Sequence, residues 1–136
     1  MKHLTTTILL TLLVLGGCNN EVTYDQLELV ERSGLMHEIN SQIPYTGVAV
    51  EYHDNGQLSF KGNYKDGELD GLAKGYFDNG QLRFKDNYKD GKQDGLYESY
   101  YYNGQLEFKG NFKDGKDEGL SENYDENGKA IPLNSE

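Results

Sequence analysis

The chain has 136 residues, a formal charge of −10, one cysteine and no tryptophan. This length suits one folded domain, and a lone cysteine excludes an internal disulfide and any cysteine-based metal cage. The acidic balance argues against a nucleic-acid partner, because phosphate contacts need clustered Lys and Arg. Only 35% of the residues are hydrophobic, but 11 Tyr and 5 Phe argue against simple disorder. The few apolar residues must therefore be placed systematically.

The first 17 residues have the features of an export signal. Lys2 precedes an uncharged, mostly apolar stretch at residues 4–15, which is too short to span a bilayer as a helix. The stretch ends in Leu15-Gly16-Gly17-Cys18, which resembles the lipobox of bacterial lipoprotein signal peptides. An ordinary secretory signal with an incidental cysteine is the alternative.

The lipobox resemblance implies that residues 1–17 are removed and that Cys18 carries acyl chains. Residues 18–23 are then a lipidated tether, and the membrane is contacted through those chains. Asn19 rather than Asp follows the cysteine, which by the same resemblance favours the outer membrane, facing the periplasm. With Lys2 removed, 12 basic against 23 acidic residues give the mature chain a charge of −11.

An internal repeat organises the rest of the chain. Asn-Gly pairs recur every 24 residues from Asn55 to Asn127, and Asp-Gly pairs recur with the same period. The blocks are 47–70, 71–94, 95–118 and a truncated 119–136. The stretch 24–46 is a degenerate leading unit, expected to form a hairpin that caps the first exposed edge. The predicted class is all-β: an elongated, single-layer antiparallel meander of stacked hairpins.

Each Asn-Gly pair predicts a hairpin turn, because both residues tolerate positive φ. A three-residue loop at 54–56, with Gly56 in the left-handed region, pairs Tyr52 with Leu58 and Val50 with Phe60. This register collects the apolar residues on one side of the sheet. The Asp-Gly connection at the opposite edge is expected to be a longer polar loop.

The expected apolar side is the candidate partner-binding face. Its aromatic columns repeat from block to block, and Tyr is favoured at interfaces. Either the sheet curls and buries this face against itself, or a partner covers it. The ten residues predicted to share it are Tyr52, Phe60, Tyr64, Tyr76, Phe84, Tyr88, Tyr100, Phe108, Phe112 and Tyr124.

The pattern G-L-x-x-x-Y-x-x-N-G-Q-L-x-F-K-x-N-Y-K-D-G resembles the bacterial variant of the MORN repeat over residues 47–136. This resemblance implies a single-layer sheet of stacked hairpins. Many relatives are exported or lipidated, and one group is classed as the antitoxin half of toxin–antitoxin systems. Asp86 departs from the pattern, because the sister blocks carry glycine at 62 and 110.

Other chemistries have weaker support. His37 and His53 do not repeat and lack a nucleophile arrangement, so we predict no catalytic residues, no cofactor and no small-molecule substrate. Calcium at the Asp-Gly edge is an alternative to a solvated turn edge, although Lys side chains stand beside the acids. The carboxylates of that edge are Asp66, Asp70, Asp90, Asp94, Asp114, Asp117 and Glu118. We predict no metal site.

Two functions remain from the sequence. One is a lipid-anchored protein-binding module, in its specific form an antitoxin or immunity protein facing a toxin domain. The other is an envelope scaffold without a toxin. A column of Lys61, Lys85 and Lys109 on the opposite side is either a solubilising stripe or a docking strip for an acidic partner.

Overall fold

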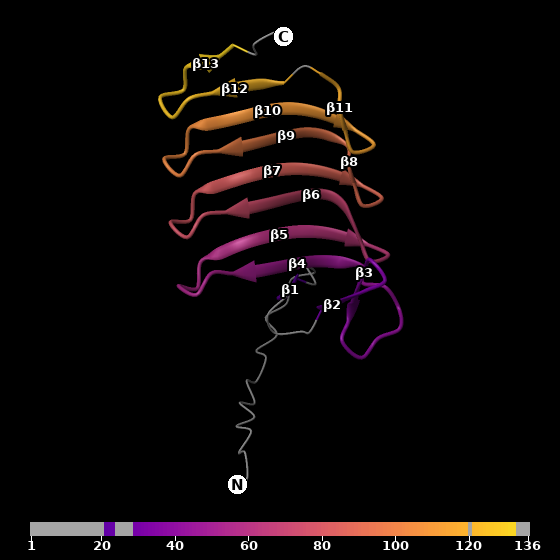
Figure 1. Cartoon of the computed structure of the whole chain (residues 1–136). Helices are drawn as coiled ribbons and strands as arrows, with labels where there is room; N and C mark the ends of the chain where they lie inside the picture. Colours follow the sequence, from indigo (N-terminus) through magenta and orange to yellow (C-terminus); the bar gives the residue numbers. More distant parts are fainter. Residues whose placement is uncertain (1–20, 24–28, 120, 133–136) are drawn as a thin grey trace.

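The computed structural model describes residues 21–23, 29–119 and 121–132, which form only strands and turns. Figure 1 shows one tall stack of hairpins, which confirms the all-β antiparallel prediction. No described segment is a helix long and apolar enough to cross a membrane. In spatial order the main sheet holds β1 (Glu21–Thr23), β4 (Gly47–Tyr52), β5 (Leu58–Lys65), β6 (Glu68–Tyr76), β7 (Leu82–Lys89), β9 (Gly95–Tyr100), β10 (Leu106–Lys113), β12 (Glu122–Tyr124) and β13 (Ala130–Ile131).

Four short strands complete the fold. β8 (Lys92–Gln93) pairs with β7, and β11 (Lys116–Asp117) pairs with β10. β2 (Leu29–Arg32) and β3 (Leu35–Glu38) form a separate two-stranded sheet. Every pairing is antiparallel except that of β1 with β4.

The Asn-Gly turns form the left edge of Figure 1 and have the predicted geometry. His53 N–H donates to Gln57 O at 2.8 Å, and Gly56 N–H donates to His53 O at 2.8 Å. Gly56 has φ of 82°, so the turn is a three-residue loop that ends on a left-handed glycine. The same pair of bonds recurs at the turns that contain Gly80, Gly104 and Gly128.

The turn asparagines also join one repeat to the next. Asn55 Oδ1 accepts Gln57 N–H within its own turn, while Asn55 Nδ2 donates to Asp78 O at 2.7 Å. Asn79 and Asn103 make the equivalent bonds to the turns that follow them. The asparagine is therefore used for the turn conformation and for stacking the turns in line.

The Asp-Gly connections are tighter than we expected. Asp66 and Gly67 have φ of 51° and 86°, and Lys65 pairs directly with Glu68. This is a two-residue hairpin turn of type I′, which Asp-Gly favours because both positions accept positive φ. The expectation of a longer polar loop was wrong. The same geometry recurs at Asp90-Gly91 and Asp114-Gly115.

The N-terminal hairpin covers a turn instead of the first strand edge. β2 and β3 join at Ser33-Gly34, and Met36 N–H donates to Gly67 O at 2.9 Å. Gly67 N–H in turn donates to Tyr45 O at 2.8 Å. The first edge is instead occupied by β1, which lies in the stretch expected to be a tether. The expected hairpin residues 24–28 lie outside the described residues.

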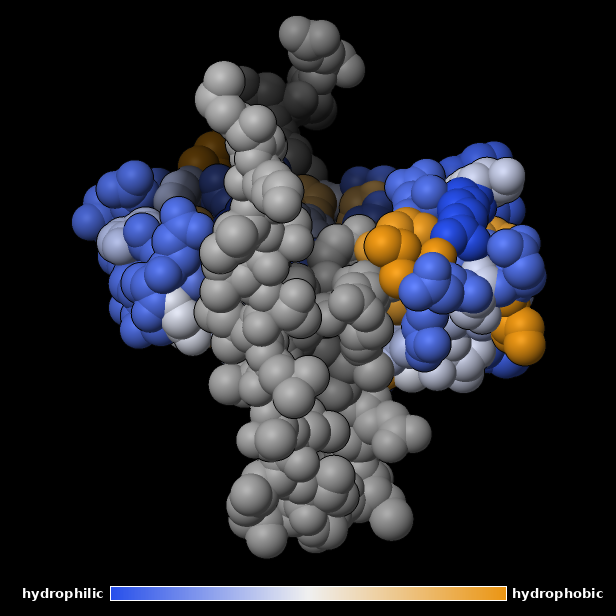
Figure 2. All heavy atoms as spheres, turned by 90° about the horizontal axis from the view of Figure 1, so that it is seen from below, coloured by the Kyte–Doolittle hydropathy of each residue, from blue (hydrophilic) through white to orange (hydrophobic). Residues whose placement is uncertain are grey.

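A small hydrophobic core lies at this end of the molecule. It contains Leu29, Met36, Tyr45 and Ala49, with the partly buried Tyr64 packed against it. Seen from below the stack, the edge with the Asn-Gly turns is hydrophilic, whereas apolar patches reach the surface on the side of β2 and β3 (Figure 2). The repeats beyond this core depend on a different kind of packing.

Candidate functional site

A β-bulge near each Asn-Gly turn decides which side chains share a face. Tyr52 pairs with Leu58 as predicted, but the register then shifts by one residue. Glu51 pairs with Phe60, and Val50 with Lys61. The predicted Val50–Phe60 pair is wrong, because two residues of β5 oppose one residue of β4 at this point.

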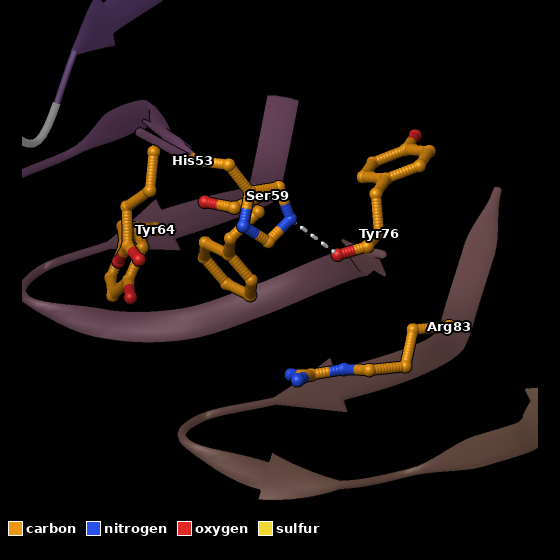
Figure 3. Close-up of a pocket in the computed structure, with 7 residues that line it drawn as sticks. His53, Ser59, Tyr64, Tyr76 and Arg83 are labelled. Atoms are coloured by element: carbon orange, nitrogen blue, oxygen red, sulfur yellow. Dashed lines mark hydrogen bonds between the residues drawn. The ribbon is translucent and has the colours of Figure 1, made fainter. Parts of the chain in front are cut away.

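The shift separates the ten predicted residues into two sets. Tyr76 follows Gly75, and Gly75 pairs with Phe84, so Tyr76 and Phe84 point to opposite sides. Figure 3 shows the ring of Tyr76 pointing away from Tyr64 and Arg83. The single aromatic face was therefore wrong. One side carries Tyr52, Tyr76, Tyr100 and Tyr124, and the other carries Phe60, Tyr64, Phe84, Tyr88, Phe108 and Phe112.

The side with the phenylalanines, here called the Phe face, packs against itself. It comprises Phe60, Tyr64, Phe84, Tyr88, Tyr97, Phe108 and Phe112. Ala49 and Ala73 on this side are 0% and 1% exposed. The rings of Phe60 and Phe84 lie 6.4 Å apart, and those of Tyr97 and Phe108 lie 5.7 Å apart. Rings thus pack over small residues within the repeats.

The second repeat packs its phenylalanine differently. A Cβ added at Gly62 would lie 2.7 Å from the Phe60 ring, so that ring lies over the glycine two residues further along its own strand. Phe108 lies over Gly110 in the same way. Asp86 fills this position in the second repeat, and the Phe84 ring lies over Gly75 of the neighbouring strand instead. In each repeat the phenylalanine ring therefore lies over a position that carries glycine.

The opposite side, here called the Tyr–Lys face, carries half-buried tyrosines, exposed only at Tyr52, and includes the buried Val50. It comprises the cross-strand pairs Tyr52–Leu58, Tyr76–Leu82 and Tyr100–Leu106 and the lysines Lys61, Lys74, Lys85 and Lys109. Tyr52 is 50% exposed. Lys85 Nζ lies 3.1 Å from Glu98 Oε2, to which Tyr100 Oη also donates at 3.3 Å. Tyrosine, leucine and lysine side chains thus repeat along this surface.

The comparison with known families fits this geometry. Residues 45–66, 69–90 and 93–114 each match the family described as MORN repeat variant. These three segments are repeats of the MORN variant. The matched segments are in phase with the observed hairpins, which confirms the resemblance for the three full repeats, whereas the truncated unit 119–136 lies outside the matched segments. No curated protein matches the chain at a significant level.

A shallow hollow of about 340 Å³ lies between the first two MORN repeats. Figure 3 shows its labelled lining residues, among them His53, Ser59 and Arg83. His53 Nε2 donates to Tyr76 O at 2.9 Å, and the guanidinium of Arg83 lies 5.4 Å from the Phe84 ring centre. Burial raises the pKa of Glu51, another lining residue. Within the described chain no hydrogen bond joins Ser59 to His53.

The remaining candidate residues are separated in space or used locally. His37 is buried beside the N-terminal core and forms an isolated bridge with Pro44, away from His53. Among the described residues no group of three or more His, Cys, Asp or Glu side chains is placed to hold a metal ion. Asp94 bonds Lys113 Nζ at 2.6 Å, and Asp70 accepts from Asp90 N–H. Cys18 lies outside the described residues.

Asp86 is the most unusual side chain of the Phe face. It is 2% exposed, and its Oδ2 accepts from Gln93 Nε2 at 2.8 Å. Its Oδ1 is buried without a hydrogen-bond partner in the described structure. Burial, and then the neighbouring Asp86 carboxylate, raise the pKa of Tyr88 to about 12. The sequence revealed Asp86 as a departure from the repeat, but it did not reveal the effect on Tyr88.

The raised pKa of Tyr88 predicts a loss of stability in alkali. An unfolded tyrosine ionises near pH 10, while the folded Tyr88 keeps its proton to about pH 12. Its contribution is therefore complete below pH 10 and is lost as the pH rises to about 12. Tyr88→Phe, which copies Phe112 of the next repeat, should make the free energy of unfolding fall less steeply over that range. Urea titrations at pH 9 and pH 11 measure the free energy of unfolding of both proteins. An equal decrease between the two pH values in both proteins would refute the prediction.

Proposed function

We propose that this chain is a non-catalytic protein-binding module whose Tyr–Lys face contacts the partner. The observation that carries the proposal is that the two faces of the sheet differ in composition and packing. The Phe face packs its rings over small residues of the sheet, while the Tyr–Lys face repeats half-buried pairs of tyrosine and leucine beside lysines, with Tyr52 exposed. Tyrosine contributes large, rigid contact area and a hydroxyl, which suits a protein interface.

The proposal includes a membrane anchor at Cys18. The lipobox-like segment and the polar residues after it support acylation there, with the repeats held at the periplasmic side of the outer membrane. The specific form we propose is an antitoxin or immunity protein. Support comes from the resemblance to MORN-variant antitoxins and from the charge of −11 on the chain without residues 1–17, which would steer a basic toxin domain toward it.

A scaffold without a toxin is the second candidate. The stack ends on β13, a two-residue strand whose residues are exposed. Further strands added at such an edge would extend the sheet from one molecule to the next. Assembly that depends on protein concentration, with no partner captured, would favour this candidate.

Photo-crosslinking from the two faces tests the proposed function. A crosslinking amino acid replaces Tyr76 on the Tyr–Lys face or Phe84 on the Phe face, two positions that point to opposite sides. In intact cells, position 76 should give a defined heterologous protein adduct and position 84 should not. The Cys18→Ala variant should lose both membrane association and palmitate labelling. An adduct from position 84 alone would overturn the assignment of the face.

A toxin encoded by a gene next to the gene of this chain would identify the candidate partner. Co-expression with the intact chain should rescue cells from that toxin, and Tyr76→Ala should weaken the rescue. A matched Gln57→Ala variant changes an exposed turn residue and controls for expression. Full rescue by the Tyr76 variant would contradict a role for the Tyr–Lys face.

A further inference from the structure

Two isoleucines in one short loop project into solvent at the N-terminal end of the molecule. Ile43 is 76% exposed, the highest value among the large hydrophobic residues of the described chain, and Ile39 is 44% exposed. Both belong to residues 39–43, here called the isoleucine loop, which follow β3 and precede the bridge at Pro44. A single exposed apolar residue is ordinary, but two in a loop of this length form a candidate contact surface.

The segment around the isoleucine loop is uncharged. Residues 39–47 contain no Asp, Glu, Lys or Arg, although the whole chain has 23 acidic and 13 basic residues. Burial of apolar side chains does not depend on ionic attraction, so a contact made through this segment is insensitive to salt.

The backbone of the isoleucine loop is fixed by hydrogen bonds to side chains. Arg32 Nη1 donates to Ser41 O at 2.8 Å, and Arg32 Nη2 donates to Ile39 O. Ser41 N–H donates to Glu38 O at 2.9 Å, and Ile43 N–H donates to Ser41 Oγ at 3.0 Å. Polar groups that already have partners lose less free energy when water is removed around them. The loop can therefore enter an apolar environment at a reduced desolvation cost.

The loop lies at the end of the stack nearest the proposed anchor. β1, β2 and β3 lie together at the lower end of the sheet in Figure 1, and Figure 2 shows apolar patches at the surface on the side of β2 and β3. In the sequence, Asn19 and Asn20 alone separate Cys18 from the first residue of β1. Three residue steps reach at most about 11 Å, so acyl chains on Cys18 bring this end of the sheet to the bilayer surface.

We propose that the isoleucine loop inserts into the lipid surface beside the anchor and holds the stack upright on the membrane. The inference rests on the acylation of Cys18 in the proposed function and adds a second point of contact. A single flexible anchor leaves the orientation of the sheet free, whereas an anchor and an apolar loop together restrict it. Exposed Glu38 directly precedes the loop and would repel anionic headgroups, so the surface that fits is zwitterionic lipid.

An upright stack keeps both faces of the sheet accessible. The main sheet runs from β1 to β13 in eight strand-to-strand steps of about 4.8 Å, which place β13 about 40 Å from β1. With the N-terminal end on the membrane, the strands run along the bilayer surface and the two faces stand at right angles to it. The Tyr–Lys face can then contact a protein partner without contact to lipid.

Tryptophan reporters test this orientation, because the chain has no tryptophan of its own. Ile43→Trp places a reporter in the isoleucine loop. The matched control is Ile131→Trp, which changes another exposed isoleucine, on β13 at the opposite end of the stack. The acylated chain of each variant is reconstituted into phosphatidylcholine vesicles, with and without lipids brominated in their acyl chains, which quench tryptophan at short range. Circular dichroism verifies the fold of each variant, and palmitate labelling verifies the anchor.

We expect brominated lipid to quench about half of the emission from position 43 and to leave the emission from position 131 unchanged, because interfacial apolar groups enter the acyl-chain boundary. The quenching should be the same in 50 mM and 500 mM salt. In the Ile43→Trp chain, Ile39→Asn should lower the quenching about twofold, because the loop loses apolar area. Gln42→Asn, a change at an exposed polar residue of the same loop, should leave it unchanged.

Equal quenching at both positions, or none at position 43, would overturn the inference. A blue shift at position 43 that grows with protein concentration, without quenching by brominated lipid, would assign the loop to a contact between two copies of the chain and would also overturn it. Palmitate labelling without quenching at position 43 would leave the anchor in place and remove the loop contact alone. Absence of labelling would overturn the anchor and this inference together.

Discussion

Phe108→Ala should lower the free energy of unfolding by about 3 kcal/mol, whereas Tyr100→Ala should lower it by less than about 1 kcal/mol. The two rings belong to adjacent strands but point to opposite sides. Phe108 lies over Gly110 and packs against Tyr97 at 5.7 Å, so its loss leaves a cavity in the Phe face. Tyr100 lies half-buried on the Tyr–Lys face, where its hydroxyl bonds Glu98 and no other ring is recorded against it in the described structure. Urea unfolding followed by circular dichroism measures both values.

The same two variants should separate folding from binding. Tyr100→Ala should weaken partner capture in a fully folded chain, because the Tyr–Lys face loses an aromatic contact. Phe108→Ala should bind normally at temperatures where it remains folded. Similar losses of stability for both variants would contradict the assignment of two faces with different roles. Tyr97→Ala, which removes the ring that contacts Phe108 and Phe112, should behave like Phe108→Ala.

The turns were predictable because their chemistry is local. Asn-Gly at 55–56 fixed the loop length, and the observed bonds between His53, Gly56 and Gln57 have the geometry expected of a left-handed glycine. The Asp-Gly turn was misjudged for a different reason. The polar residues after Asp66-Gly67 suggested a loop, yet they continue as the first residues of β6. Polarity at an exposed strand end does not distinguish a strand from a loop.

The two faces were not predictable from the assumption that all apolar residues share one side. That assumption is sound where a sheet has one solvated face, but here a bulge shifts the register between Glu51 and Tyr52. A bulge is hard to recognise in a sequence, because it adds only one polar residue to the strand, here before Phe60. A better signal was present in the small residues Ala73 and Gly75, which alternate with Lys74. Small residues beneath rings indicate the packed side of the sheet. Tyr76 follows Gly75 directly in the strand, so its side chain points to the other side.

The N-terminal end was the hardest part to predict. Its contacts are made between segments distant in the chain, as when Met36 and Tyr45 bond the turn at Gly67. No repeat pattern constrains such contacts, and β1 enters the sheet in parallel, which hairpin logic does not anticipate. Repetition made the central hairpins predictable, while the unique leader depended on tertiary packing.

Gly75→Ala should destabilise the fold by about 2 kcal/mol, although alanine in a strand usually stabilises relative to glycine. A Cβ at position 75 would overlap the Phe84 ring, which lies directly over this glycine. The ring cannot move to the place that Phe60 and Phe108 use, because Asp86 fills it. Thermal and urea unfolding measure the loss. A neutral or stabilising effect would show that the ring has another site.

The double variant with Asp86→Gly tests whether the two positions are coupled. Glycine at 86 copies residues 62 and 110, and the Phe84 ring can then lie over it, as the sister rings do. Ser99 already carries a Cβ opposite Phe108 in the third repeat, so alanine at 75 should then be tolerated. A double-mutant cycle should give a coupling free energy of about 1 to 2 kcal/mol in favour of the pair. Additive effects would mean that the ring does not exchange between the two glycine sites, and that Asp86 is retained for its bond to Gln93 and its effect on Tyr88.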